Sequence, residues 1–196
     1  MQTEKLVSFD GKYFKGPLIL TPTLYKDKRG HFYESWNHKI FNQKIEKTNI
    51  DKEIIFVQDN HSLSKKGVLR GMHFQVSPRE QGKLVRCILG SIFDVIIDLR
   101  SNSPTYSSWG SVTLSGENYR QLWIPPGFAH GFLTISDKAE VLYKTTEFWY
   151  EEFERTIKWS DKNIDIKWPN LNCDLTISEK DQAGQLFDEI MQKDLL

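Results

Sequence analysis

Residues 83–99 read KLVRCILGSIFDVIIDL, and this stretch indicates the kind of fold to expect. Apolar side chains stand at every second position, at 85, 87 and 89 and again at 93, 95 and 97. A period of two is typical of β-strands that bury one face. Gly90 and Ser91 supply turn residues between the two halves. The stretch therefore predicts two strands, 83–89 and 91–99, paired as a β-hairpin.

Short β-type segments bounded by turn residues continue on both sides of this stretch. They span residues 17–24, 31–36, 54–60, 67–75, 111–114, 120–125, 132–135, 140–146 and 156–159. So many short strands favour an all-β sandwich or barrel over a βαβ fold.

Two segments have helical spacing instead, one near each end of the chain. Asn37 is suited to cap a helix over residues 38–47, and Ser178 to cap a helix over 179–193. The apolar stripe of the second helix would consist of Ala183, Leu186, Phe187, Ile190 and Met191.

Length and composition bound the remaining possibilities. The 196 residues fit one domain, 1–196, whose core needs no disulfide or metal. The 26 basic and 26 acidic residues balance, which argues against nucleic acid or a membrane surface as a partner. Residues 1–100 carry 17 Lys and Arg against 11 Asp and Glu, a balance of +6, whereas residues 101–196 carry 9 against 15, a balance of −6.

The cysteine content and the hydropathy of the chain indicate the cellular compartment to expect. Cys87 and Cys173 form no CxxC pair, no run of 18 apolar residues occurs, and the first residues contain no apolar signal core. We therefore expect a reduced, cytoplasmic protein.

A polar cluster interrupts the apolar pattern in the first half of the chain. Its segments are FVQDNHS at 56–62, VLRGMHFQ at 68–75 and QGKLVR at 81–86. Arg70 and His73 point to opposite faces of a regular strand, but Gly71 between them is a suitable place for a kink. Because polar groups are costly to bury without partners, an interior lined by them predicts a ligand cavity rather than a packed core.

Three histidines, His61, His73 and His130, allow two interpretations. Each could be a structural histidine held by one hydrogen bond, and His61 and His130 could also end strands. Three imidazoles within a barrel could also bind a metal, but the usual signature of metal-binding barrels, HxH followed by a nearby Glu, is absent here. The residues therefore predict no metal site.

Nine strings occur in order along most of the chain. They are FVQDNHS, GVLRGMHFQ, QGKLVRC, FDVIIDLR, SPTYSSWG, QLWIPPGFAHGF, AEVLYK, IKWP and ISEKD. Over residues 22–181 the chain strongly resembles the dTDP-4-dehydrorhamnose 3,5-epimerase family, a cupin-fold group of nucleotide-sugar epimerases. The resemblance implies a cupin jelly roll, and an isomerase that requires no metal or redox cofactor. Its substrate would be dTDP-4-dehydro-6-deoxy-D-glucose, whose C4 ketone acidifies the protons at C3 and C5, and its product dTDP-4-dehydro-L-rhamnose.

The resemblance implies a role for four residues in the reaction. His73 matches the base that removes the proton at C3 and then at C5, and Asp181 matches its carboxylate partner. Tyr143 matches the acid on the opposite face, and Lys83 the cation at the enolate oxygen. Taken alone, these residues have plainer interpretations. Asp181 could complete a helix capping box, Tyr143 could pack on a neighbouring strand, and Lys83 could be a solvated lysine at a strand edge.

Four further residues match substrate-binding positions of the family. Arg70 would clamp the diphosphate, because a guanidinium binds phosphoryl oxygens in a bidentate manner. Gln58 and Asn60, on the strand face opposite to His61, would bind the nucleotide. His130 would line the pocket from the loop 125–132, which by itself indicates a rigid Pro-Pro-Gly turn.

The sequence RGHFYE at 29–34 matches an RGxFxE strand of the family. In the family this strand crosses into a partner subunit and contacts the nucleotide there. The resemblance therefore implies a homodimer with an exchanged N-terminal strand, in which Arg29, Phe32 and Glu34 contact the ligand of the partner.

One segment departs from the family pattern. Residues 147–152 read EFWYEE, where many relatives carry a tyrosine in place of Phe148, followed by Ser/Pro-rich residues. This segment leaves open whether the nucleotide is dTDP, GDP or CDP, and whether only C3 is inverted. Two other classes remain as alternatives: a non-catalytic module that binds a nucleotide sugar, and a metal-dependent cupin oxygenase or isomerase.

Overall fold

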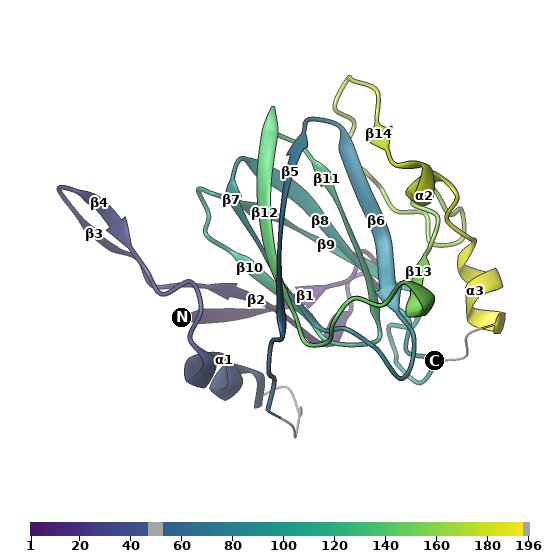
Figure 1. Ribbon diagram of the computed structural model, residues 1–196, viewed down its shortest axis with the longest axis horizontal. Helices are drawn as coiled ribbons and strands as arrows, with labels where there is room; N and C mark the ends of the chain where they lie inside the picture. Colours follow the sequence, from purple (N-terminus) through teal and green to yellow (C-terminus); the bar gives the residue numbers. More distant parts are fainter. Residues whose placement is uncertain (47–52, 194–196) are drawn as a thin grey trace.

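The computed structural model describes residues 1–46 and 53–193, and its centre consists of two β-sheets packed face to face (Figure 1). The first sheet has the order β1 (Gln2–Val7), β2 (Tyr13–Thr21), β10 (Gln121–Ile124), β7 (Lys83–Leu89), β12 (Lys138–Thr145), β5 (Gln58–Lys65). The second has the order β13 (Glu154–Thr156), β6 (Val68–Gln75), β11 (Phe128–Thr134), β8 (Ser91–Asp98), β9 (Trp109–Ser115), and β14 (Thr176–Ile177) pairs with β6. The predicted all-β class is confirmed.

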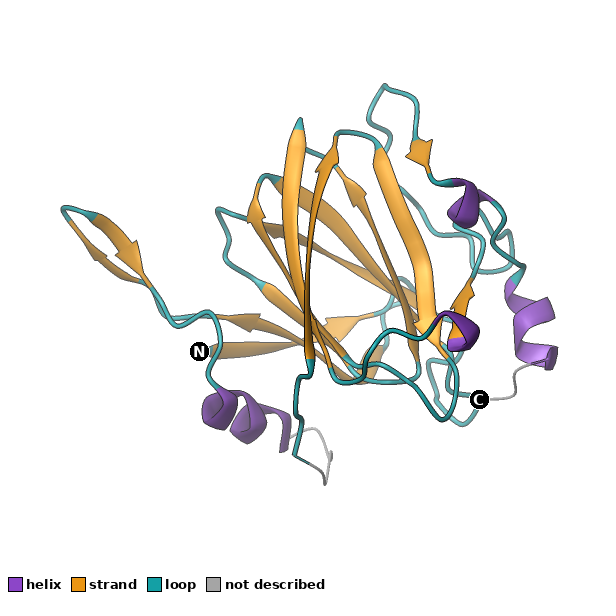
Figure 2. Cartoon of the chain, viewed as in Figure 1, coloured by secondary structure: helices purple, strands orange, loops and turns teal. Residues whose placement is uncertain are grey.

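The remaining elements lie outside the two sheets (Figures 1 and 2). β3 (Tyr25–Asp27) and β4 (Gly30–Phe32) form a two-stranded arm that projects away from the barrel. The helices are short: α1 (His38–Ile45), η2 (Glu151–Phe153), α2 (Glu179–Gln182) and α3 (Phe187–Lys193).

Strands β7 and β8 have the predicted positions, but the predicted hairpin is wrong. β7 pairs with β10 and β12 in the first sheet, whereas β8 pairs with β11 and β9 in the second. Gly90 therefore carries the chain from one sheet to the other. Its φ of +71° lies in the left-handed region, and a Cβ there would lie 1.9 Å from the carbonyl oxygen of Lys138. Only glycine fits this corner.

Apolar side chains are buried in three layers. The first layer lies between the sheets and contains Val85, Cys87 and Ile96. The second lies between the outer face of the second sheet and the C-terminal segment, and the third packs α1 on the outer face of the first sheet. Burial of each large aliphatic side chain stabilises the fold by ~1.5–3 kcal/mol. The strands are therefore apolar on both faces over much of their length.

Helix α1 begins as predicted. The Asn37 side chain accepts a hydrogen bond of 3.1 Å from the backbone N–H of Ile40 and so caps the helix. Phe41 and Ile45 are buried beneath it. The predicted end at Lys47 lies outside the described residues.

The predicted continuous helix 179–193 is wrong, because the chain breaks it into α2 and α3. Gln185 between them bonds to a neighbouring segment instead, donating to Thr156 O (3.0 Å) and accepting from Lys158 N (2.8 Å). A Cβ on Gly184 would lie 3.0 Å from the backbone of Lys158, so a glycine permits this approach. Leu186 is 44% exposed, whereas Phe187 belongs to the second layer with the rest of α3's apolar face.

Several strand limits also differ from the prediction. β11 begins at Phe128, so His130 lies within a strand and not in a loop. β5 starts later than the predicted 54–60 and continues to Lys65, while β13 is displaced toward the N-terminus from the predicted 156–159. The predicted strand 31–36 is reduced to β4. β1 was not predicted because only Leu6 of its residues is buried, which leaves no apolar alternation.

Candidate active site

A cavity of about 370 Å³ opens between the two sheets and is lined mainly by polar side chains. Its lining residues are Gln58, Asn60, Ser62, Arg70, His73, Gln81, Lys83, His130, Gly131, Phe132, Tyr143, Trp149 and Glu154. The predicted ligand cavity is thus present. Seven predicted site residues line it. An eighth, Asp181, does not line the cavity but contacts His73.

Strand alternation explains why one end of the interior is polar. On β7, Val85 and Cys87 belong to the apolar layer between the sheets, and Lys83 continues the same face. On β12, Ala139 and Val141 precede Tyr143 in the same way. Each strand therefore passes from the apolar core into the cavity along one face.

His73 and Arg70 both line the cavity because β6 is irregular between them. The pairing of β6 with β11 shifts register opposite this point. Gly71 has a φ of +120°, and a Cβ there would lie 2.6 Å from the Cα of Gly131. The kink predicted at Gly71 is confirmed, and it turns the side chains of Arg70 and His73 to the same side.

Asp181 contacts His73 from α2. Its Oδ1 lies 2.6 Å from His73 Nε2, and its Oδ2 accepts a hydrogen bond of 3.2 Å from Gly71 N. Burial raises the pKa of Asp181, but the hydrogen bond and charge of His73 outweigh it, so this pKa lies below its ordinary value. Ser178 caps α2 by accepting from Asp181 N, yet the Asp181 carboxylate bonds to β6 instead of completing a capping box.

Lys83 is only 7% exposed, so its interpretation as a solvated edge lysine is wrong. Its Nζ extends across the interior and donates a hydrogen bond of 3.2 Å to the carbonyl oxygen of His73. Burial lowers the pKa of Lys83 to about 8, although the negative charges of Glu154 and Asp94 oppose this shift. Lys83 is thus a buried cation beside His73.

His130 forms a second histidine–carboxylate pair in the interior. It faces His73 in the register of β11 and β6, and its Nε2 lies 2.7 Å from Oδ1 of the fully buried Asp94. Asp94 was not predicted. It stands among apolar residues of β8, where alternation alone does not distinguish a site residue from a buried structural acid.

Tyr143 stands on the sheet opposite to His73, since β12 belongs to the first sheet and β6 to the second. Burial raises the pKa of Tyr143, and Glu154 raises it further, against the opposing charge of Arg70. Arg70 itself is held by a hydrogen bond of 3.1 Å from its Nε to Ser64 Oγ. The cavity thus has a phenol on one wall and an imidazole on the other.

Glu154 and Trp149 line the cavity but were not among the predicted residues. Trp149 Nε1 donates a hydrogen bond of 2.9 Å to Glu154 Oε2, and Lys180 forms an ion pair with the same carboxylate. Burial raises the pKa of Glu154, but the hydrogen bond from Lys180 and other neighbours bring it below its ordinary value. The only signal in the sequence concerned Trp149, which lies between Phe148 and Tyr150 in the segment 147–152 that departs from the family pattern.

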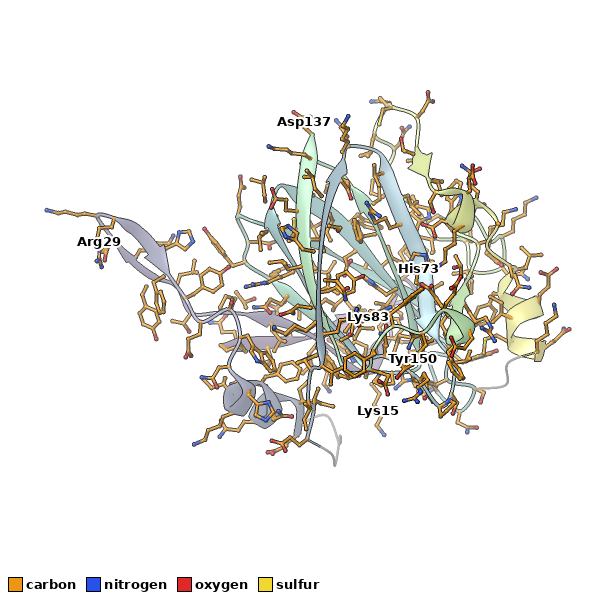
Figure 3. The ribbon with its side chains drawn as sticks, in the orientation of Figure 1. Lys15, Arg29, His73, Lys83, Asp137 and Tyr150 are labelled. Carbon is orange, nitrogen blue, oxygen red and sulfur yellow. The ribbon has the colours of Figure 1, made fainter. Side chains whose placement is uncertain are left out.

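Arg29, Phe32 and Glu34 lie outside the cavity of their own chain. Arg29 stands on the arm far from His73 and Lys83 (Figure 3) and forms an ion pair of 2.6 Å with Asp27. Phe32 is exposed and lies on β4, and Glu34 accepts a hydrogen bond from Asn37. Within one chain, these three predicted residues do not join the others.

His61 does not share the cavity with His73 and His130. It points to the outer face of β5, where its Nε2 lies 3.2 Å from Glu140 Oε2. Across residues 1–46 and 53–193, no group of three or more His, Cys, Asp or Glu side chains is arranged to hold a metal ion. The three histidines therefore form no common ligand set.

Comparison with known proteins relates the chain to one family. The family model for dTDP-4-dehydrorhamnose 3,5-epimerase matches residues 12–189. The dTDP-4-dehydrorhamnose 3,5-epimerase of Shigella flexneri is 52% identical over 170 residues, covering 87% of this chain and 90% of the relative.

Solved structures give the same result. A dTDP-6-deoxy-D-glucose-3,5-epimerase from Legionella pneumophila, in complex with dTDP-4-keto-L-rhamnose, has a TM-score of 0.86 and 41% identity over 96% of this chain and 95% of that one. An epimerase from Mycobacterium tuberculosis has a TM-score of 0.88 and 33% identity, covering 98% of this chain and 93% of that one.

Proposed function

Because the chain belongs to the dTDP-4-dehydrorhamnose 3,5-epimerase family, we propose that its cavity binds dTDP-4-dehydro-6-deoxy-D-glucose and that the residues described above invert C3 and C5. The chain is an isomerase, and the product of this reaction is dTDP-4-dehydro-L-rhamnose. The roles of these residues rest on one arrangement. The His73–Asp181 pair lies on one wall of the cavity, Tyr143 lies on the opposite wall, and the Lys83 ammonium lies between the two sheets.

His73 acts as the base. An ionised carboxylate only accepts hydrogen bonds, so Asp181 holds the proton of neutral His73 on Nε2 and leaves the lone pair on Nδ1. Nδ1 takes the proton from C3, and the electron pair of the broken C–H bond delocalises to the C4 oxygen as an enolate. Asp181 then stabilises the imidazolium that forms.

Lys83 stabilises the enolate oxygen. Its pKa of about 8 leaves it mostly protonated at neutral pH, and its burial strengthens its interaction with a developing negative charge. In the resting site the Lys83 ammonium donates to the His73 carbonyl oxygen, so it lies beside the reacting carbon. Among the described residues it forms no ion pair.

Tyr143 returns a proton from the opposite face. Its raised pKa keeps the phenol protonated at neutral pH, so it can donate to the carbanion carbon and invert it. The proton on His73 passes to solvent and Tyr143 regains one from solvent, which restores both groups. The same sequence of steps at C5 completes the second inversion.

Arg70, Gln58, Asn60 and His130 hold the substrate. The guanidinium of Arg70, fixed by Ser64, suits the diphosphate. Gln58 donates to Asn60 through a hydrogen bond of 2.9 Å, so the two amides act as one polar surface toward the nucleotide. His130, fixed by Asp94, presents its ring to the same cavity.

A second copy of the chain supplies Arg29, Phe32 and Glu34. The arm carries two exposed aromatic residues, Tyr25 and Phe32, and exposed apolar surface of this kind is commonly covered by a partner. A homodimer in which the arms are exchanged would bring these residues to the partner's cavity. Residues 1–196 would then act as one epimerase domain per subunit.

The proposed location is the cytoplasm. Cys87 and Cys173 are both free thiols, which suits a reducing compartment. In the described part of the chain, no helix is long and apolar enough to cross a membrane.

Conversion of the substrate tests this function. The purified protein, incubated with dTDP-4-dehydro-6-deoxy-D-glucose, should give product inverted at C3 and C5 by NMR. Inversion at C3 alone would identify a mono-epimerase, and failure to convert the substrate would overturn the proposal. Thermal unfolding with dTDP, GDP or CDP identifies the nucleotide, because the one that binds raises Tm; a shift with dTDP alone is expected.

A further inference from the structure

The segment 147–150, which leaves β12 toward η2, is held by side-chain amides of the barrel. Gln81 Nε2 donates to Glu147 O (2.7 Å), and Gln58 Oε1 accepts from Trp149 N (3.1 Å). The third amide belongs to Gln75 at the end of β6. The backbone of this segment, which belongs to no strand, is thus bound by three glutamine side chains, in addition to Thr145 Oγ1 on Glu147 O and Glu147 Oε1 on Phe148 N.

The Gln75 side chain binds the backbone on both sides of Trp149. Its Oε1 accepts a hydrogen bond of 2.8 Å from Tyr150 N, and its Nε2 donates one of 3.1 Å to Phe148 O. The peptide groups before and after Trp149 are therefore both bound to one side chain. Nε2 also donates to Arg79 O, so every strong hydrogen-bonding atom of the amide is used.

Gln75 is buried and does not line the cavity, whereas Trp149 does. Gln75 is 4% exposed, and Trp149 is 52% exposed at the mouth of the cavity. An indole so exposed has little packing to hold it, and its conformation depends on its backbone and on its bond to Glu154. Fixing a contact residue before the ligand arrives increases affinity, because less conformational entropy is lost on binding.

We propose that Gln75 is a positioning residue that acts through Trp149 to preorganise the mouth of the cavity for the nucleotide sugar. The identity of this ligand rests on the proposed function. Gln75 stands two residues from His73 on β6 and opposite Glu154 in the register with β13. It therefore links the strand of the base to the segment that contacts the ligand, without touching the ligand itself.

The test is Gln75→Glu, which keeps the shape of the side chain but replaces the Nε2 donor with a second acceptor. Phe148 O and Arg79 O then face a carboxylate oxygen. Loss of one or two hydrogen bonds should raise KM for the nucleotide sugar and Kd for dTDP about tenfold, with kcat changed by less than about twofold. Gln75→Met, which has a similar length and no donor, should behave in the same way and guards against a folding defect of the first variant.

A double-mutant cycle separates positioning from general destabilisation. If Gln75 acts through Trp149, Gln75→Glu should change KM by less than about twofold in a Trp149→Ala background. Multiplicative effects of the two substitutions on KM would overturn the proposal, as would a loss of kcat at unchanged KM. Thr105→Val is the control: Thr105 is buried and bonds to Asp98 away from the cavity, so this variant should lower Tm without raising KM.

A measurement without ligand keeps the two proposals distinct. In protein labelled with 5-fluorotryptophan, the ¹⁹F signal missing from Trp149→Phe identifies Trp149. Gln75→Glu should shift or broaden this signal, and an unchanged signal would overturn the positioning role. If the wild-type protein neither bound dTDP nor converted the substrate while this signal still moved, the proposed function would fail and the link from Gln75 to Trp149 would stand.

Discussion

Asp181 and His73 are 108 residues apart in the chain, yet Oδ1 of one lies 2.6 Å from Nε2 of the other. The Asp181 side chain is 5% exposed, and its second oxygen is bound to Gly71 N. The carboxylate therefore cannot turn toward water, and it fixes both the orientation of the imidazole and the position of its proton. The same contact joins the C-terminal segment to β6.

Substitution of Asp181 by Asn should impair catalysis more than binding. The amide cannot stabilise the imidazolium, so we expect kcat to fall by about a hundredfold or more with little change in KM. Steady-state kinetics of Asp181→Asn measures this, with Glu179→Gln as the matched control, since Glu179 is exposed on the same helix. An Asp181→Asn enzyme with wild-type kcat would refute the role of the pair.

Activity should decline in alkaline solution as Lys83 loses its proton. The ammonium is the active form and its pKa is about 8, so kcat/KM should fall as pH rises through about 8. Replacement of Lys83 by Met should remove this limb of the profile and lower kcat by about 10²–10³-fold. A wild-type profile that stays flat to pH 9.5 would show that the charge of Lys83 is not needed.

Stability should change in the opposite direction over the same range. The pKa of Lys83 is about 8 in the folded protein and ~10.4 in the unfolded chain. Between these values the unfolded chain binds more protons, so the free energy of unfolding rises with pH. Denaturant unfolding of the wild type and Lys83→Met at pH 7 and 10 tests this: only the wild type should gain this contribution.

The exchanged arm predicts complementation between two inactive variants. One carries His73→Asn with an intact arm, and the other carries Arg29→Ala and Phe32→Ala with an intact His73. Unfolding and refolding an equal mixture should recover about a quarter of wild-type activity, because half of the dimers are mixed and each has one complete site. If each arm served its own chain, the mixture would stay inactive.

The corner between the sheets should depend on Gly90. Gly90→Ala combines a left-handed backbone with a Cβ 1.9 Å from Lys138 O, and should lower the free energy of unfolding by about 2–4 kcal/mol. Gly11→Ala is the control, since its φ of +86° is similar but no atom lies within 4 Å of the added Cβ. Urea unfolding should give a cost of about 1 kcal/mol for Gly11→Ala; equal costs would mean that the contact with Lys138 is unimportant.

The sequence was sufficient to locate most of the strands and the start of α1, and to predict the polar cavity. The alternation over 83–99 located β7 and β8, and Gly71 was correctly expected to kink β6. The same alternation could not show which strands pair. A strand of a sandwich buries one face toward the opposite sheet, and this is so whether the next strand in the chain pairs with it or lies in that opposite sheet. The hairpin prediction failed for this reason.

Contacts between distant segments account for the other differences. The break before α3 depends on backbone bonds from Gln185 to Thr156 and Lys158, which helical periodicity does not contain. The burial of Lys83 depends on the facing sheet, and Glu154 reaches the cavity through the pairing of β13 with β6. A resemblance to known enzymes identified Lys83. Trp149 lies in the segment 147–152 that departs from those enzymes, so the resemblance assigned it no role, and no sequence pattern pointed to Glu154.

We infer that one base, His73, serves both carbons, and proton NMR in deuterated buffer measures the exchange at each of them. With dTDP-4-dehydro-6-deoxy-D-glucose, the wild-type enzyme should exchange the hydrogens at C3 and C5 for deuterium. His73→Asn should exchange neither, while its affinity for dTDP stays close to that of the wild type. Exchange at either carbon by His73→Asn at the wild-type rate would mean that another group removes the proton at that carbon.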